Sequence, residues 1–554
     1  MRLDAPIKEL TFADGQTLKL RNDSIVVFVG PNNAGKTTCL RDIYCHLSGD
    51  SNCNLVSSID FTKPSIEDVK SLLNEIAIEK HDPLLSYEGM GFRISDYDMG
   101  NYSKFSYYPK SIKEMLFHFL TTETRLSACF PQKSVPRKDP ATGPIALLAR
   151  DSSYLEKVSS AFHSAFSLEV IPNYFNGGEI PLCLGSTPVA PKDMPVPQIN
   201  DFMYETLSSY PLAHHQGDGM RSFLGIVLFI YANQYTSMFI DEPESFLHPP
   251  QAKLMGSLIA SNETSGRQLF ISTHSKELLN GMLESGPDRI QVVRITRAND
   301  VNDFALLDVD DISKITSNTL LKYSDLINSL FHERTVLCES DSDCMFYQLI
   351  WDTVRASEPT PLFLPVGGKG RYKTYVDLLS KLHIDYSVVA DADILRNPTD
   401  IKSVLLQDNV VWESIKSDWE TINQELGSDE GLSVASLKAE IDEVFKQCKG
   451  PTLSKTLSKT NCGKIRKLLE SKSRWDEMKR HGINALSGGA NKACKRIVNT
   501  LSHHNVQIVP VGELECFIPS IDSHGPSWVN DVLQEYPDLN DAVYDMARDF
   551  VSHW

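Results

Sequence analysis

The stretch SIVVFVGPNNAGKTT, residues 24–38, decides the fold of the first half of this 554-residue chain. Its first six residues form a continuous apolar run, which is typical of a strand in the middle of a sheet covered on both faces. The turn that follows fits the pattern G-x-x-x-x-G-K-[ST], and a helix is expected from Lys36. Strand, glycine-rich turn and helix in this order predict a phosphate-binding loop whose backbone N–H groups face a nucleotide.

This phosphate loop supplies most of the ATP ligands that we expect in the first half. Lys36 would reach the β and γ oxygens, and Thr37 would bind Mg²⁺. The residues expected to hold the nucleotide here are Gly30, Asn32, Asn33, Gly35, Lys36, Thr37 and Thr38.

A second part of the same site follows much later in the chain. Residues 237–244, SMFIDEPE, predict an apolar strand with carboxylates at its carboxyl end. We expect Asp241 to hold Mg²⁺ through the water shell of the ion and Glu242 to orient the attacking water. The alternative, a charged turn after an ordinary strand, is less consistent with the nearby phosphate loop. Residues from about 55 to 205 separate the two parts and are predicted to be an insertion, with helices at 66–79, 111–122 and 154–166.

These motifs resemble the ABC-type ATPases, including the SMC- and Rad50-like group. The segment QGDGMRS, residues 216–222, is similar to their signature motif, although Gln216 and Asp218 depart from its usual start. The resemblance implies that Gly217 and Gly219 meet the γ-phosphate bound by a second subunit, so that the chain works as a dimer or larger homo-oligomer. His274 resembles the histidine that contacts the γ-phosphate. No glutamine lid is evident, and residues 124–127 or Gln132 are the candidates for that region.

A second set of carboxylates predicts a divalent-metal site in the other half. The strands VLCE, residues 336–339, and VVADAD, residues 388–393, end in Glu339 and in the pair Asp391 and Asp393. In an extended backbone, residues i and i+2 point the same way, and parallel strands end at one edge of a sheet. Oxygen ligands of this kind suit Mg²⁺ or Mn²⁺. The alternative is that these carboxylates only cap the helices that follow.

The carboxylate set resembles the TOPRIM domain of topoisomerases, primases and OLD-family (overcoming lysogenization defect) nucleases. The resemblance adds Asp343, the glycine turn at 367–370, and a later glutamate that completes a second metal site. Glu515 is the first choice for that glutamate and Glu513 the second. The resemblance also implies a lysine that assists cleavage, for which the candidates are Lys492 and Lys369.

Composition excludes several other classes. The net charge of −18 argues against a protein that coats DNA with a basic surface. Eleven cysteines without C-x-x-C spacing indicate reduced thiols rather than a disulfide framework or a zinc site. The start of the chain lacks the apolar core of a signal peptide, and the longest apolar run, 223–232, is too short for a membrane span. We therefore expect a soluble cytoplasmic protein.

One local exception to the acidic composition is residues 446–480, with eleven Lys or Arg against three Asp or Glu. This segment predicts an arm that follows a phosphate backbone, with Trp475 available to stack on a base. The alternative is a solvated helical face.

The sequence thus predicts an α/β protein with two domains. Residues 1–320 form an ABC-type P-loop ATPase with an inserted, helical or dimerising region. Residues 330–554 form a Rossmann-like TOPRIM domain with a helical basic insertion at about 400–500. The order of the two resembles an OLD-family endonuclease, which implies ATP, Mg²⁺ or Mn²⁺ at both sites, and a DNA substrate, with RNA not excluded.

Family members act in defence against phage, and the resemblance extends to defence partners such as a helicase or a retron reverse transcriptase with its DNA. The alternative is an SMC- or Rad50-like clamp or sensor that binds nucleic acid without cutting it.

Overall fold

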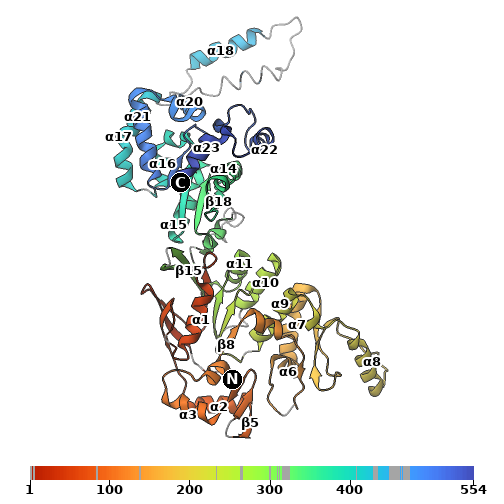
Figure 1. Cartoon of the computed structure of the whole chain (residues 1–554). Helices are drawn as coiled ribbons and strands as arrows, with labels where there is room; N and C mark the ends of the chain where they lie inside the picture. The colour runs from red at the N-terminus through yellow and green to blue at the C-terminus, as the bar shows by residue number, and fades with distance from the viewer. Residues whose placement is uncertain are drawn as a thin grey trace. The chain divides into compact units, whose positions relative to one another are not determined.

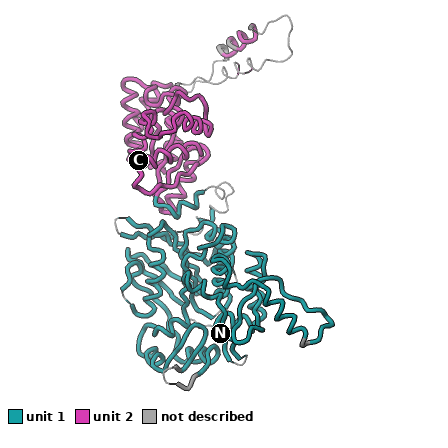
Figure 2. Tube along the Cα trace, turned by 45° about the vertical axis from the view of Figure 1, so that its right-hand side comes forward, with its two compact units in different colours: residues 1–333 teal, residues 334–554 magenta. Residues whose placement is uncertain are grey.

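The computed structural model describes residues 3, 6–50, 52–82, 85–136, 139–232, 234–261, 266–298, 301–307, 310, 312–314, 325–406, 408–427, 434–447, 462, 465 and 474–554. The chain divides into two compact units, residues 1–333 and 334–554 (Figure 2). Within the described ranges, no helix is both long and apolar enough to cross a membrane.

The first unit is built on a six-stranded sheet (Figure 1). In sheet order its strands are β16 (Val301–Leu307), β15 (Ile290–Ala298), β3 (Ile25–Val29), β14 (Gln268–Ser272), β13 (Ser237–Asp241) and β8 (Phe117–Leu120). All neighbours pair in parallel except β15 and β16, which are antiparallel. Parallel pairing places the carboxyl ends of β3, β13 and β14 at one edge, where the phosphate loop begins.

Helices cover this sheet and explain the apolar runs in the sequence. They are α1 (Lys36–His46), α9 (Asp218–Tyr231), α10 (Pro249–Ala260) and α11 (Lys276–Ser285). Every residue of β3 is buried, as the continuous apolar run predicts for a doubly covered strand. Helix α9 is buried from Ser222 to Ile230, so its apolar sequence reflects a helix enclosed on all sides.

The stretch predicted as an insertion contains small sheets and helices. Its elements, with the short strands before it, are β1 (Ile7–Phe12), β2 (Thr17–Lys19), β4 (Val56–Phe61), α2 (Ile66–Ile76), β5 (Ala77–Asp82), β6 (Leu85–Gly89), β7 (Phe92–Ile94), α3 (Asp96–Lys104), α4 (Lys110–Leu116), α5 (Thr122–Ser127), β9 (Gln132–Lys133), α6 (Pro144–Leu148), α7 (Ser152–Phe166), β10 (Glu169–Pro172), β11 (Glu179–Ile180), β12 (Leu182–Gly185) and α8 (Val196–Ser208). The helix predicted over 111–122 is wrong in its second half. Residues 117–120 form β8, which pairs with β13, so this stretch also supplies a strand of the central sheet.

The second unit has a four-stranded, fully parallel sheet. In sheet order its strands are β18 (Leu362–Pro365), β17 (Arg334–Cys338), β19 (Asp385–Ala390) and β20 (Val506–Ile508). The helices beside it are α14 (Asp341–Val354), α15 (Tyr372–Lys381), α22 (Pro526–Glu535) and α23 (Asp545–Ser552). Trp528 and Tyr544, both fully buried, join the last two helices to α14 in one apolar core.

The helical excursion between β19 and β20 consists of α16 (Pro398–Val404), α17 (Asn409–Leu426), α18 (Val434–Gln447), α20 (Arg474–His481) and α21 (Gly488–Ser502). Most of the basic segment predicted as a phosphate-binding arm lies outside the described residues. Trp475 is described and is only 2% exposed. The prediction that its ring is available to stack on a base is therefore wrong, because the ring is buried in the unit.

Candidate functional sites

The phosphate loop has the backbone that the glycine pattern predicts. Gly30 has φ +143°, and a Cβ there would lie 2.1 Å from the Ile295 carbonyl oxygen of β15. Gly35, with φ +99°, begins α1 as its N-cap. Both positions require glycine. Gly30 combines a positive φ with a close backbone neighbour, and Gly35 has a positive φ where the chain turns into the helix.

Lys36 lies within this loop. Its Nζ donates hydrogen bonds to the carbonyl oxygens of Gly30 at 2.9 Å and Pro31 at 2.8 Å. Burial lowers the pKa of Lys36, and the carboxylates of Glu242, Glu244 and Asp241 oppose this shift. The amine therefore lies close enough to the acidic strand end to serve the same site. Asn32 and Asn33 are exposed on the loop, and Thr38 is half-buried in α1.

Two predicted Mg²⁺ ligands meet directly. The Thr37 hydroxyl donates to Asp241 Oδ1 at 2.8 Å, and the Ser272 hydroxyl donates to the same oxygen. Hydroxyl and carboxylate oxygens are ligands that Mg²⁺ prefers. Thr37 and Asp241 therefore form a fitting place for the ion of a Mg–nucleotide complex. Ser272 was missed by the sequence reasoning, because an ordinary serine at a strand end carries no distinguishing pattern.

Glu242 and His274 also lie together, next to an acid that the sequence did not single out. His274 Nδ1 lies 3.4 Å from Glu242 Oε1 and 3.3 Å from Glu244 Oε1. The hydrogen bond that His274 donates to Glu242, together with the negative charges of Glu242 and Glu244, raises the pKa of His274. Glu242 itself has φ +46°, an uncommon left-handed conformation for a residue other than glycine. The predicted water-orienting acid and phosphate-contacting histidine are thus neighbours.

Arg125 is a further residue of this site, and the sequence placed only its region near the nucleotide. Its guanidinium is fully buried and donates to the Asp241 backbone oxygen at 2.8 Å and to Thr122 Oγ1 at 3.1 Å. Gln132, the other candidate for this region, instead accepts from the backbone N–H groups of Ile145 and Ala146 at the start of α6. Arg125 can therefore fix the end of β13, whereas Gln132 serves a helix terminus.

The two signature glycines differ in their surroundings. Gly217 is the N-cap of α9 and has open space around its missing Cβ. A Cβ at Gly219 would lie 2.7 Å from the Phe246 carbonyl oxygen. Gly219 therefore allows the start of α9 to approach the loop after β13, which is a packing role alongside the nucleotide contact that the resemblance predicts.

In the second unit, the predicted metal ligands gather at the carboxyl edge of the parallel sheet. Glu339 follows β17, Asp391 follows β19, and Glu513 and Glu515 follow β20. Asp343 lies in the first turn of α14. The structure thus brings together side chains from four separate segments, as the strand order requires.

The local geometry of the Asp391 and Asp393 pair differs from the prediction. Asp391 is the N-cap of the 3₁₀ helix η6 (Ala392–Arg396), and Asp393 lies within its first turn. Asp391 keeps an extended backbone, with φ −61° and ψ 153°, but Asp393 does not, because the strand ends at Ala390 and the 3₁₀ turn begins at Ala392. Asp343 also has a structural role, since its Oδ2 accepts from the Ser340 N–H and hydroxyl, both at 2.8 Å.

These carboxylates repel one another in a partly buried place. Burial raises the pKa of Glu339, and Asp393 adds to the shift. Burial raises the pKa of Asp391 well above its usual range, and Asp343, Glu339, Asp393 and Glu513 raise it further. A crowded set of buried like charges is stabilised by any bound cation.

Two lysines supply positive charge to this acidic cluster. Lys369 Nζ lies 2.8 Å from Asp393 Oδ2, and Lys479 Nζ lies 3.1 Å from Glu513 Oε2. Lys479, on α20, was not predicted, since its position in a basic segment does not reveal which lysine turns toward the acids. Lys492 is exposed on α21, and its proposed role in cleavage stays a prediction.

The fit of a metal ion depends on these lysines. Among the described residues, no three His, Cys, Asp or Glu side chains already stand in an arrangement that would hold an ion. Asp393 and Glu513 are paired with lysine, and Glu515 Oε1 accepts from the Gly525 N–H at 2.9 Å. The carboxylate donors are of the kind that Mg²⁺ and Mn²⁺ prefer, and the two lysines compete with a cation for Asp393 and Glu513.

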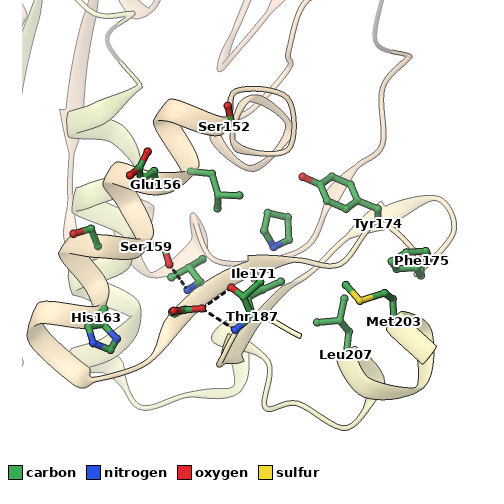
Figure 3. Close-up of a pocket in the computed structure, with 15 residues that line it drawn as sticks. Ser152, Glu156, Ser159, His163, Ile171, Tyr174, Phe175, Thr187, Met203 and Leu207 are labelled. Atoms are coloured by element: carbon green, nitrogen blue, oxygen red, sulfur yellow. Dashed lines mark hydrogen bonds between the residues drawn. The ribbon is translucent and has the colours of Figure 1, made fainter. Parts of the chain in front are cut away.

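A separate cavity of about 510 Å³ lies in the first unit between α7, β10 and α8 (Figure 3). Its walls are mainly apolar and include Leu155, Val170, Met203 and Leu207. None of the phosphate-loop or carboxylate residues lines it.

The fold and the two sites define a P-loop ATPase joined to a TOPRIM domain. Residues 210–280 match the AAA domain family AAA_21, whose description refers to the AbiEii toxin of a type IV toxin–antitoxin system. Residues 330–393 match the TOPRIM domain of overcoming lysogenization defect protein-like sequences. The expected combination of an ATPase and an OLD-like TOPRIM domain is confirmed.

The chain is also similar to a phage nuclease. The chain is 27% identical over 168 residues to the Old nuclease of Escherichia phage P2, a match over 29% of this chain and 28% of the relative. The chain therefore matches less than a third of that nuclease's length.

Two solved structures are also similar to part of the chain. The SMC head domain from Thermotoga maritima is 11% identical, with 56% of this chain and 100% of that chain covered and a TM-score of 0.29. An SMC head bound to the C-terminal winged-helix domain of ScpA is 10% identical, with 56% and 99% covered and a TM-score of 0.35. The strand order and the phosphate loop of the chain itself define the ATPase fold.

Proposed function

We propose that this chain is an ATP-regulated, divalent-metal-dependent endonuclease that cleaves DNA phosphodiester bonds, acting in defence against phage. The observation that carries the proposal is the gathering of Glu339, Asp391, Asp393, Glu513 and Glu515 at one edge of a parallel sheet. The match to an OLD-like TOPRIM domain and the similarity to a phage nuclease support the same activity.

The carboxylates would hold divalent ions, whose chemistry would be to activate water and to offset the charge on the leaving oxygen of a phosphodiester. Two lysines of this chain would position the acids and bind the substrate. Lys369 and Lys479 hold Asp393 and Glu513 in place while the edge is free of substrate. Both lysines carry the charge needed to meet a DNA phosphate once the acids have turned to the metal.

The ATPase half would control this reaction. Lys36, Thr37 and Asp241 would bind Mg–ATP, while Glu242 orients water and His274 meets the γ-phosphate. The signature glycines imply that a second copy completes each nucleotide site, so a homodimer is the smallest active form that we propose. The sign of the control, activation or inhibition by ATP, is decided by the assay below.

The test is a cleavage assay with purified protein, supercoiled plasmid and about 5 mM Mg²⁺ or Mn²⁺, with and without ATP. We expect nicked or linear product with the metal and none in EDTA or with Asp391→Ala. Lys36→Ala should abolish ATP hydrolysis and the effect of ATP on cleavage, but should retain metal-dependent cleavage itself. An RNA substrate in parallel separates DNase from RNase activity.

One observation favours a second function. Asp393 and Glu513 are each paired with a lysine, whereas a metal site would have them face a shared central position. This arrangement is compatible with a clamp or sensor that binds nucleic acid through the lysines without cutting it. DNA binding without any product in either metal would identify that function and overturn the nuclease.

A further inference from the structure

Glu244 has a buried position in the ATPase site that the motif alone does not explain. The side chain is 6% exposed and lies between the loop after β13 and the loop after β14. It is three residues beyond Asp241, and the sequence pattern gave it no role. A buried carboxylate is costly unless several donors satisfy it, so its contacts reveal what it holds.

In the described part of the chain, the hydrogen bonds to the Glu244 carboxylate reach one oxygen and come from the loop after β14. Oε1 accepts from the Thr273 hydroxyl at 2.7 Å and from the His274 backbone N–H at 2.9 Å. The same oxygen lies 3.3 Å from His274 Nδ1. Glu244 therefore fixes both the backbone and the ring of His274.

The remaining groups show that Glu244 is more than a loop anchor. Within the described residues, Glu244 Oε2 is buried without a hydrogen-bond partner. Two hydrogen-bond donors and the His274 ring, which Glu242 shares, approach Oε1, and among the described residues no donor reaches Oε2; this is a poor arrangement for stability alone. It is the arrangement expected where the position of the donors matters, as at sites that orient a histidine for another ligand.

We propose that Glu244 is a positioning residue for ATP hydrolysis, a role that rests on the ATPase function proposed above. By holding Nδ1 of His274 toward the acids, it leaves Nε2, on the opposite side of the ring, as the nitrogen that meets the γ-phosphate. It also keeps Nδ1 within 3.4 Å of Glu242, so that the histidine and the water-orienting acid are held as a pair.

The test is a double-mutant cycle on steady-state ATP hydrolysis with Glu244→Gln, His274→Ala and the double variant. Glu244→Gln should lower kcat by roughly 10–100-fold, while KM for ATP changes by less than about threefold. If Glu244 acts through His274, the double variant should be within about twofold of His274→Ala alone. Glu67→Gln, a charge removal at an exposed position of α2, is the matched control and should retain wild-type activity.

A second pair of variants serves if Glu244→Gln does not fold. Thr273→Val removes one donor to Glu244 Oε1 with little change of shape, and Thr273→Ser retains the hydroxyl. Thr273→Val should lower kcat for ATP hydrolysis in a chain that keeps His274, but should not lower it further in His274→Ala. Thr273→Ser should have the kcat of wild type.

Several outcomes would overturn the positioning role. They are unchanged kcat in Glu244→Gln, unchanged kcat in His274→Ala, or losses that multiply in the double variant. Failure of the proposed function looks different, because wild type would then hydrolyse ATP no faster than Lys36→Ala, and the positioning role would fall with it.

Discussion

Replacing Asp391 by Asn should stabilise the metal-free protein while removing its response to Mg²⁺. Asp391 is buried beside four other acids. Burial is the main cause of its raised pKa, and the charges of these acids raise the pKa further. Its side chain makes no capping hydrogen bond in the turn that it begins, so the amide loses no such bond. The change therefore removes repulsion without leaving a broken interaction.

The size of the effect follows from the partial neutralisation of the cluster. Lys369 and Lys479 already offset two of the neighbouring carboxylates, so the gain is a fraction of the several kcal/mol that an isolated buried charge costs. We expect a gain of about 1–2 kcal/mol, which for a domain of this size raises Tm by about 2–8 °C.

The assay is thermal melting in EDTA and then in about 10 mM Mg²⁺. Wild type should gain Tm on adding the ion, by mass action on the folded state, and Asp391→Asn should gain little. Asp549→Asn, at an exposed position of α23, controls for the loss of one negative charge and should behave as wild type. The reasoning fails if the Asp391 variant melts lower than wild type in EDTA, or if Mg²⁺ raises the Tm of both equally.

Three shorter predictions test other parts of the molecule. Gly219→Ala should lower the free energy of unfolding in urea by about 1 kcal/mol despite better helix propensity, whereas Gly217→Ala, with open space around it, should change it by less than about 0.5 kcal/mol. In EDTA, the stability difference between wild type and Asp391→Asn should shrink from pH 7.5 to pH 5.5, measured by chemical denaturation. A raised carboxyl pKa costs stability when the group is ionised, and the cost disappears as the folded state takes up its proton. Lys479→Met should lower Tm in EDTA, because Glu513 loses its partner, and should enlarge the gain from Mg²⁺; equal gains in variant and wild type would argue against competition between lysine and metal.

Much of the fold was predictable because its signals are local. The central strands are continuous apolar runs, and each is followed by a glycine turn or by acids, as in β3, β13 and β19. In a parallel sheet such strand ends meet at one edge whatever their separation in the chain. This rule is enough to bring Thr37 to Asp241 and Glu339 to the region of Asp391.

The parts that were missed depend on tertiary contacts. Residues 117–120, FHFL, continue the apolar pattern of the helix before them, and only pairing with β13 makes them a strand. Asp393 lies in a 3₁₀ turn because the strand ends at Ala390, three residues earlier than the motif suggested. Lys479 and Glu244 are ordinary residues in the sequence, and their roles follow from partners that lie far along the chain or in another loop.

The stretch between the phosphate loop and the acidic strand cannot be a separate appendage, because it carries Arg125 into the nucleotide site. The buried guanidinium holds the Asp241 backbone at the end of β13 and reaches Thr122 in its own helix. Its backbone carbonyl lies against α9, where a Cβ at Gly225 would come within 2.0 Å of it. A shift of α9, which begins at the signature glycines, therefore has to displace Arg125 or move with it. Arg125 therefore connects α9, whose first turn carries the signature glycines, to the end of the strand that presents Asp241.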